Sequence, residues 1–262
     1  MDPLVIRTDD EAIATVKLNR PKALNALSDE LIAQLQGTLD ALAVDRTIRV
    51  IILKGAGKAF CAGHDLREMT AARQAEDGGA AYFQDLFARC SHLMSTLPRL
   101  PQPVIAQVQG IATAAGCQMV AHCDIAVASD DAQFGVNGVN IGLFCSTPMV
   151  ALSRNIPRKQ AFEMLTTGDF ASARRAVELG LINRAVPVAD LESETAALAR
   201  QIAGKFGGAV ALGKEAYYQQ LEMGLSDAYA YTGQVMAQNM LMPETAEGID
   251  AFLTKRDPEW TQ

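Results

Sequence analysis

The chain has 262 residues, of which 49% are hydrophobic and 20% are charged, as is usual for a globular protein with one large domain or a domain and a small appendage. Its formal net charge of −7 at pH 7 argues against broad binding to nucleic acid or to anionic membranes. An anionic ligand would therefore need a local patch of cationic side chains.

Strands and helices alternate through the first part of the chain. Residues 13–18 read as a strand, which the Arg20-Pro21 pair ends. Ser28 is a typical N-cap, acidic residues follow it in the first turn, and apolar residues then recur at helical spacing. The further elements expected are strand 50–53, a helix near 82–97, strand 104–108, a short helix from 116 and strand 125–128. Repeated units of this kind predict parallel strands with helices packed outside them.

From about residue 189 the strand signals end and the remaining chain predicts consecutive helices. We expect these helices at residues 191–206, 209–222, 225–240 and 245–253. Glycines between 204 and 208 mark a hinge. We therefore divide the chain into a core of residues 1–203 and a C-terminal helical region of residues 204–262.

Two segments of small residues each leave a strand and lead into a helix. The first is Lys58-Ala59-Phe60-Cys61-Ala62-Gly63-His64-Asp65-Leu66, and the second is Ile111-Ala112-Thr113-Ala114-Ala115-Gly116-Cys117. Small side chains let a ligand lie directly on the main chain, where backbone N–H groups bind it. Two such loops are what an oxyanion hole for a thioester carbonyl requires.

These loops belong to a series of motifs that resembles the crotonase superfamily, that is, the enoyl-CoA hydratase/isomerase family. The matching segments are 19–27, 58–69, 109–117, 123–128, 134–135, 141–143, 176–182 and 186–187. The resemblance covers roughly residues 4 to 256, and the motifs occur in the family's order. Residues 140–148 resemble the branch called enoyl-CoA hydratase domain-containing protein 3.

The resemblance implies an α/β fold of the crotonase type, a spiral of ββα units followed by a C-terminal helical trimerisation region. It implies a coenzyme A thioester as the substrate and no covalently bound cofactor. By the same analogy we expect a homotrimer or a dimer of trimers. The three histidines are far apart and show no metal-ligand spacing, so we expect no metal site.

The chemistry implied is stabilisation of a thioester enolate by two backbone donors. By match to the family motif, these donors should be the N–H groups of Ala62 and Ala115, converging on a single acyl oxygen. Loss of one such donor costs about 10²–10³-fold in rate. The family usually has glycine at the second position. Ala115 is therefore a departure, which requires a negative φ or a methyl group that points away from the thioester.

The resemblance also implies contacts with the coenzyme A part of the ligand. The residues concerned are Lys22, Ala23, Leu24, Lys58, Ala59, Phe60, Asp65, Leu66 and Lys255. Residues 22–24 match the loop that touches the nucleotide, and 58–66 match the segment that lines the adenine and pantetheine. Lys255 is expected to reach phosphate from the same or a neighbouring subunit. A solvated surface lysine is the alternative for each of the three lysines.

Both carboxylates of the family's hydratases are missing at the matched positions. The first would fall at Gln118 and the second at Gly138. An amide side chain orients water but does not accept its proton at neutral pH, and glycine does neither. Positioned acid–base groups are worth about 10²–10⁴-fold each, so their loss bears directly on the reaction.

Other titratable groups lie near the motifs, and each has a structural alternative. His64 and Asp65 follow the first loop, and Asp65 is expected to cap the short helix that begins there. Glu68, one turn further on, is expected to be solvated or ion-paired, and His92 to lie in the core or on the surface. Cys145 precedes a helix start, which favours a reactive thiolate, although a packing cysteine is the more usual role.

The five cysteines are odd in number and form no CxxC pair: Cys61, Cys90, Cys117, Cys123 and Cys145. We expect reduced thiols and a cytoplasmic location. Residues 1–7 lack the apolar core of a signal peptide and the arginines of a transit peptide. The most apolar stretch, 104–128, carries several polar residues, so we expect no membrane span.

Three functions fit these observations. The first is an enoyl-CoA hydratase/isomerase-type enzyme with an oxyanion hole. The second is an isomerase or thioesterase of the same fold that uses another base or none. The third is a catalytically inactive protein that binds acyl-CoA. The missing carboxylates favour the second and third, and the family resemblance favours the first.

Overall fold

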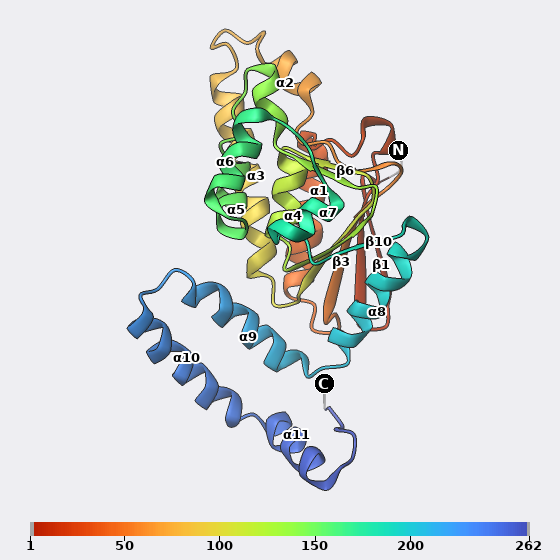
Figure 1. Cartoon of the computed structure of the whole chain (residues 1–262), viewed down its shortest axis with the longest axis vertical. Helices are drawn as coiled ribbons and strands as arrows, with labels where there is room; N and C mark the ends of the chain where they lie inside the picture. The colour runs from red at the N-terminus through yellow and green to blue at the C-terminus, as the bar shows by residue number, and fades with distance from the viewer. Residues whose placement is uncertain (1–2, 261–262) are drawn as a thin grey trace.

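The computed structural model describes residues 3–260, which form two β-sheets covered by helices (Figure 1). The larger sheet has the strand order β1-β2-β3-β5-β7-β10. The β1–β2 pair is antiparallel and each of the other neighbouring pairs is parallel. These strands are β1 (Val5–Asp10), β2 (Ile13–Leu18), β3 (Val50–Gly55), β5 (Val104–Val108), β7 (Ile125–Ser129) and β10 (Arg184–Val186).

The smaller sheet has the order β4-β6-β8-β9. Its strands are β4 (Ala59–Cys61), β6 (Ile111–Thr113), β8 (Gln133–Gly135) and β9 (Ala171–Ser172). Along the chain β3 leads to β4, β5 to β6 and β7 to β8, so each turn gives one strand to each sheet before a helix follows. This is the spiral of ββα units that the sequence predicted.

Eleven α-helices occur between residues 3 and 260. They are α1 (Asp29–Ala43), α2 (Leu66–Ala72), α3 (Ala80–Thr96), α4 (Ala115–His122), α5 (Pro148–Asn155), α6 (Arg158–Thr167), α7 (Ala173–Leu179), α8 (Leu191–Ala203), α9 (Gly207–Gln220), α10 (Leu225–Met240) and α11 (Pro243–Thr254). The predicted helices of the first half and of the C-terminal region agree with α1, α3, α4 and α8–α11 within a few residues. Helices α6 and α7 were not predicted.

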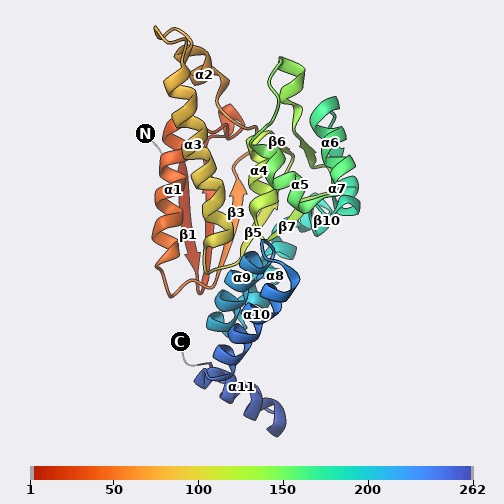
Figure 2. The ribbon, with the colours of Figure 1, turned by 90° about the vertical axis from the view of Figure 1, so that its left-hand side faces the viewer.

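Helix α1 has the N-cap and the apolar face that the sequence predicted. The Ser28 hydroxyl accepts a hydrogen bond from Leu31 N at 3.2 Å, which satisfies an amide that the helix start leaves without a partner. Leu31, Leu35 and Leu39 are fully buried and form one face of the helix. Figure 2 shows α1 and α3 side by side against the sheet, where they cover the main hydrophobic core.

Side chains of the larger sheet alternate between two cores, because successive residues of a strand point to opposite faces. In β3, Ile51 and Leu53 belong to the main core. Val50 and Ile52 face the other way and form a smaller core with Leu191 of α8. Helix α8 therefore covers the outer face of the sheet and packs as part of the spiral.

Helices α9, α10 and α11 extend away from the sheets, at the opposite end of the molecule from α2 (Figures 1 and 2). The segment after α11 returns to the start of this arm, where Trp260 Nε1 donates to Gly204 O at 3.2 Å. The Trp260 ring also lies 5.9 Å from that of Phe206, between centroids. No helix among residues 3–260 has the length and apolar character needed to cross a membrane.

A buried lysine anchors α9 to the spiral. Lys214 Nζ donates to the carbonyl oxygens of Leu97 and Gln102 at 3.0 and 2.9 Å and pairs with Asp124 Oδ2 at 2.7 Å. Tyr218, one turn further along α9, donates to Asp124 Oδ1 at 2.8 Å. An ammonium group with three acceptors is well satisfied, so removal of this one side chain leaves several buried polar groups without partners.

We therefore expect Lys214→Met to destabilise the protein by about 3–5 kcal/mol, because the largely buried Asp124 carboxylate loses its cation. Chemical denaturation at a fixed protein concentration measures this change. Lys205→Met is the matched control, since Lys205 is exposed between α8 and α9, and we expect a change below about 0.5 kcal/mol. Equal losses in the two variants would contradict the anchoring role of Lys214.

Candidate functional site

The two small-residue loops lie against each other. Strands β4 and β6 pair in parallel, with Cys61 opposite Ala112, so the segments that follow these strands start side by side. A Cβ at Gly116 would overlap the Cys61 carbonyl oxygen, and a Cβ at Gly63 would lie 3.4 Å from Ala115 N. Gly63 also has φ +88°, which side chains rarely tolerate. Glycines at these two positions therefore permit the contact.

Ala115 has the negative φ that a residue other than glycine needs at this position. It is the first residue of α4, and the positive φ of +50° falls on Ala114 instead. The Ala114 N–H donates to Gly135 O at 2.9 Å. The Ala115 N–H has no acceptor within residues 3–260, as expected for the first turn of a helix. It is therefore available to a ligand.

Ala62, the other expected donor, is already engaged. Its N–H donates to Leu24 O at 3.0 Å, so the structure does not support a role for it as an unoccupied donor. His64 forms a parallel bridge with Leu27, in which Leu27 N donates to Gly63 O at 2.7 Å and Asp65 N donates to Leu27 O at 2.9 Å. In such a bridge the amide of the central residue faces away from the paired segment.

The His64 N–H has no acceptor in the described part of the chain. The available amide of the first loop is therefore two residues beyond the predicted one. The motif gave no signal that the Leu24 carbonyl accepts the hydrogen bond of the Ala62 amide, because that contact joins residues far apart in sequence.

The segment expected to bind the nucleotide lies beside the first loop. Lys22 is exposed on a short 3₁₀-helix, η1 (Pro21–Ala23), and Lys58 is exposed just before β4. A Cβ at Gly57 would lie 2.8 Å from the Pro21 side chain, which brings the two lysine-bearing turns together. Ala23 and Leu24 are half-buried. These residues form a surface strip with two cations.

Asn25 holds this strip in place, a role that the sequence analysis missed. Its side chain is fully buried, and its Nδ2 donates to Ala56 O at 2.9 Å and to Ala59 O at 2.8 Å, while Oδ1 accepts from Arg20 N at 2.9 Å. Its φ of +54° is one that asparagine tolerates better than most residues. An asparagine after a Pro-Lys turn is the signal that was available.

The remaining predicted ligand residues divide into three groups. Ala59 and Phe60 have buried side chains, so only their main chain can meet a ligand. Asp65 caps α2 by accepting from Arg67 N at 2.9 Å, and it pairs with Arg20 at 2.6 Å, as expected for a helix cap. Arg20 and the amide of Arg67 lower the pKa of Asp65 against the opposing effect of burial. Leu66 is about half exposed.

Lys255 lies at the end of α11, and α11 is at the far end of the molecule from α2 in both views (Figures 1 and 2). It therefore does not reach this strip within one chain.

The two positions at which the sequence analysis expected the family's carboxylates differ in the space around them. Gln118 is in α4, one turn after Ala115, and is 3% exposed, with no partner for its Oε1 among residues 3–260. Gly138 is buried, and a Cβ there would overlap the Leu143 carbonyl oxygen and lie 2.9 Å from Cys145 Sγ. The loop of residues 143–145 thus fills the place of a side chain at 138, so a carboxylate does not fit there.

The other titratable candidates have largely structural environments. Cys145 is buried, and burial raises its thiol pKa, which opposes the reactive thiolate considered above. His92 is exposed on α3. Glu68 Oε2 accepts from Asp29 N at 2.8 Å, so it caps the neighbouring helix α1. None of these three groups is arranged as a general base.

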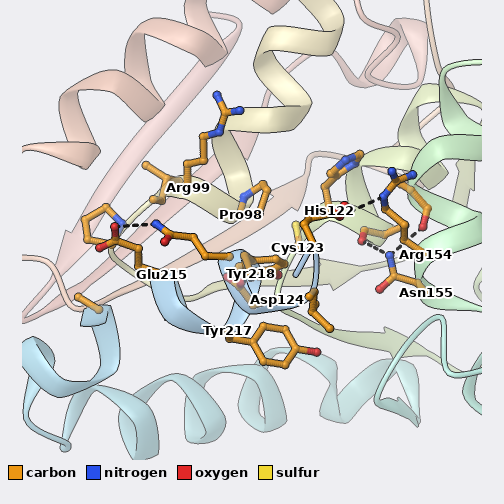
Figure 3. Close-up of a pocket in the computed structure, with 18 of the residues that line it drawn as sticks. Pro98, Arg99, His122, Cys123, Asp124, Arg154, Asn155, Glu215, Tyr217 and Tyr218 are labelled. Carbon is orange, nitrogen blue, oxygen red and sulfur yellow. Dashed lines mark hydrogen bonds and ion pairs between the residues drawn. The ribbon is translucent and has the colours of Figure 1, made fainter. Parts of the chain in front are cut away.

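A separate hollow of about 960 Å³ lies between η2 (Leu97–Arg99), the end of α4, α5 and α9 (Figure 3). His122, Asp124, Arg154 and Tyr218 line it. Helix α4 separates this hollow from the two loops, because Ala115 begins the helix and His122 ends it, about 11 Å away at 1.5 Å per residue. The hollow is therefore distinct from the candidate site.

Comparisons with known proteins identify the family of the chain. The family model described as "Enoyl-CoA hydratase/isomerase" matches residues 8–262. Two relatives are named "Enoyl-CoA hydratase domain-containing protein 3, mitochondrial", and each is 46% identical to this chain. The match to the Xenopus laevis protein covers 99% of this chain and 86% of that protein. The match to the Homo sapiens protein covers 96% of this chain and 81% of that protein. A crystal structure described as an enoyl-CoA hydratase of Mycobacterium smegmatis is 52% identical, with a TM-score of 0.95 over 99% of both chains.

The names of the frog and human relatives place those proteins in mitochondria, and the expectation of a cytoplasmic location is therefore wrong. That expectation rested on the cysteines, which were expected to be reduced. Reduced cysteines distinguish reducing from oxidising compartments, but they do not distinguish the cytoplasm from the mitochondrial matrix. The match over almost the whole chain and the shared fold show that the chain belongs to the enoyl-CoA hydratase/isomerase family.

Proposed function

We propose that this protein is an enzyme that binds an acyl-CoA thioester and stabilises its enolate with the N–H groups of His64 and Ala115. The observation that carries the proposal is that these two amides lack acceptors within residues 3–260 and lie on loops in direct contact. Fixed main-chain donors need no reorganisation when charge develops on the acyl oxygen, which makes them effective in a dry site.

The strip beside the loops supplies the rest of the ligand contacts. Lys22 and Lys58 attract the phosphates of coenzyme A as mobile point charges, which answers the need for local cations on a chain with net charge −7. The main chain of residues 58–60 and the exposed Leu66 face the adenine and pantetheine. Asn25 and Asp65 support this surface from below and do not themselves carry the ligand.

The reaction is one that does not need two carboxylates. Hydration across a double bond requires one group to deprotonate water and another to deliver a proton to Cα, and Gln118 and Gly138 do neither. Because the loop of residues 143–145 closes position 138, no single substitution restores the second carboxylate. Proton transfer at Cα of an enolisable thioester, as in isomerisation of an enoyl-CoA, therefore fits this site better than hydration.

The C-terminal helices supply an assembly surface. Helix α10 buries no residue and α11 buries only Ala251, while Leu241 and Phe252 are more than 80% exposed. Apolar surface of this extent favours association, and we propose a homotrimer or a dimer of trimers. In that assembly Lys255 of one chain would reach the phosphates bound to another.

Removal of one donor tests the oxyanion hole. Ala115→Pro deletes the N–H at the first position of a helix, where proline is tolerated. We expect a loss of about 10²–10³-fold in turnover and a loss of the long-wavelength absorbance shift that a polarised thioester gives to bound 2,4-hexadienoyl-CoA. Ala115→Gly, which keeps the N–H, should retain both. An unchanged shift in a folded Ala115→Pro variant would refute the donor role.

The lack of space for a side chain at position 138 can be tested by measuring the stability of a variant. Gly138→Ala should destabilise the protein by about 1–3 kcal/mol, because its methyl group displaces the Leu143 carbonyl. Gly37→Ala is the control, since Gly37 is exposed in α1 with open space around it, and it should stabilise by about 0.5–1 kcal/mol. Thermal unfolding of both variants measures this, and a Gly138→Ala variant as stable as the native chain would show that the loop yields easily.

Assembly is tested by light scattering coupled to gel filtration. We expect a mass of three or six chains, and a lower mass when Leu241 and Phe252 are both replaced by serine, because the shared apolar face is then weakened. A native chain that elutes as a monomer would contradict the proposal.

A further inference from the structure

The side chain of His64 is enclosed next to the amide that we assign as a donor. Its ring packs edge-on against Phe87 of α3, with centroids 5.4 Å apart and planes at 86°. Nε2 is buried and has no hydrogen-bond partner among residues 3–260. A buried imidazole nitrogen without a partner is unfavourable in a folded protein, so its retention points to an interaction with a ligand.

Gln118 presents a second unsatisfied polar atom in the same part of the molecule. It lies one turn beyond Ala115 on α4, on the helix that Gly63 contacts, and its Oε1 is buried without a partner. Two available amides and two unsatisfied side-chain atoms thus come from the first loop and from the first turn of α4, which follows the second loop. Unsatisfied groups gathered in this way are characteristic of functional sites.

The charged and titratable groups around His64 come from three helices. Asp29 of α1 pairs with Arg89 of α3 at 2.7 Å, and Glu68 of α2 accepts from the Asp29 amide. The buried hydroxyl of Tyr82 in α3 lies close to the Asp29 carboxylate. Burial lowers the pKa of His64 to about 4, with the Asp29 carboxylate acting in the opposite direction. The ring is therefore neutral, and so in its basic form, near pH 7.

The other groups beside the two loops do not serve as bases. Burial raises the pKa of Tyr82 to about 12 and those of Cys61 and Cys117 also to about 12, so their protons stay on near pH 7. Gln118 has an amide that does not take up a proton. Of the groups considered, the His64 imidazole has a neutral basic nitrogen and lies beside the two N–H donors.

We propose that the His64 imidazole is the proton-transferring group of the acyl site and performs the role of the carboxylates absent at positions 118 and 138. This inference rests on the proposed function, because it takes the acyl oxygen to lie between the His64 and Ala115 amides. One residue then supplies two functions, since its main chain binds the acyl oxygen and its side chain serves the adjacent carbon.

The step balances without a further reactant. The Cα–H bond breaks, its proton forms an N–H bond on the imidazole, and its electron pair forms the C=C bond of the enolate as the carbonyl pair moves to the oxygen. The imidazolium and the enolate then form an ion pair, which offsets the low intrinsic basicity of a desolvated ring. Return of the proton to Cγ of an enolate from a 3-enoyl thioester gives the 2-enoyl isomer, whereas return to Cα regenerates the reactant.

Exchange of the Cα protons of butyryl-CoA in D₂O isolates this step, because a saturated thioester neither hydrates nor isomerises. Mass spectrometry of the recovered thioester measures the exchange. His64→Leu keeps the main-chain N–H and a side chain of similar volume against Phe87. We expect it to lower the exchange rate at least 100-fold and to leave the absorbance shift of bound 2,4-hexadienoyl-CoA unchanged.

His92→Leu is the matched control, because His92 is an exposed histidine on α3, and it should change neither reading. The midpoint of thermal unfolding of His64→Leu should equal or exceed that of the native chain, since a residue kept for structure would destabilise on removal. Exchange within threefold of native in His64→Leu would overturn the assignment.

The same two measurements on the native chain distinguish failure of the His64 role from failure of the oxyanion hole. An absorbance shift without any Cα exchange would overturn the role of His64 while the oxyanion hole stands. The absence of both would overturn the proposed function and the inference that rests on it.

Discussion

The parallel pairing of β4 with β6 is the constraint on which the site depends. Strand spacing in a sheet is just under 5 Å, so two segments that leave neighbouring strands in the same direction begin within contact distance. Gly116 lies directly on the Cys61 carbonyl, and Gly63 lies beside the Ala115 amide. The sheet therefore brings together two amides that are about fifty residues apart in the chain, and the glycines allow the separation to stay small.

The cost of this arrangement falls on a few residues with unusual backbone conformations. Ala114 has φ +50°, and Leu24 and Asn25 follow each other at +52° and +54°. Such conformations cost of order 1–3 kcal/mol each for residues other than glycine, and these three residues lie in the two segments that form the candidate site. The three amide contacts of Asn25 offset part of this cost, as does the Ala114 N–H bond to Gly135.

Much of the fold could be predicted from the sequence, since the strand–helix alternation, the Ser28 cap and the apolar face of α1 are local signals. The motif series also pointed to the two loops, which the structure brings side by side. That Gln118 and Gly138 stand where the family's hydratases have carboxylates stays a prediction. The donor of the first loop was not predictable in this way. Which amide of residues 62–64 is available depends on the Leu24 carbonyl, and that contact is set by tertiary packing. The closure of position 138 by Leu143 is likewise visible only in three dimensions.

The length of helix α4 matters beyond the two small-residue loops. Its first residue is Ala115, and two residues after its last turn Asp124 receives Lys214 and Tyr218 from the C-terminal arm. Each residue of an α-helix advances the chain by 1.5 Å and about 100°. An insertion or deletion of one residue within α4 would therefore swing the carboxylate away from the ammonium group. The number of residues in this short helix thus sets where the arm attaches relative to the site.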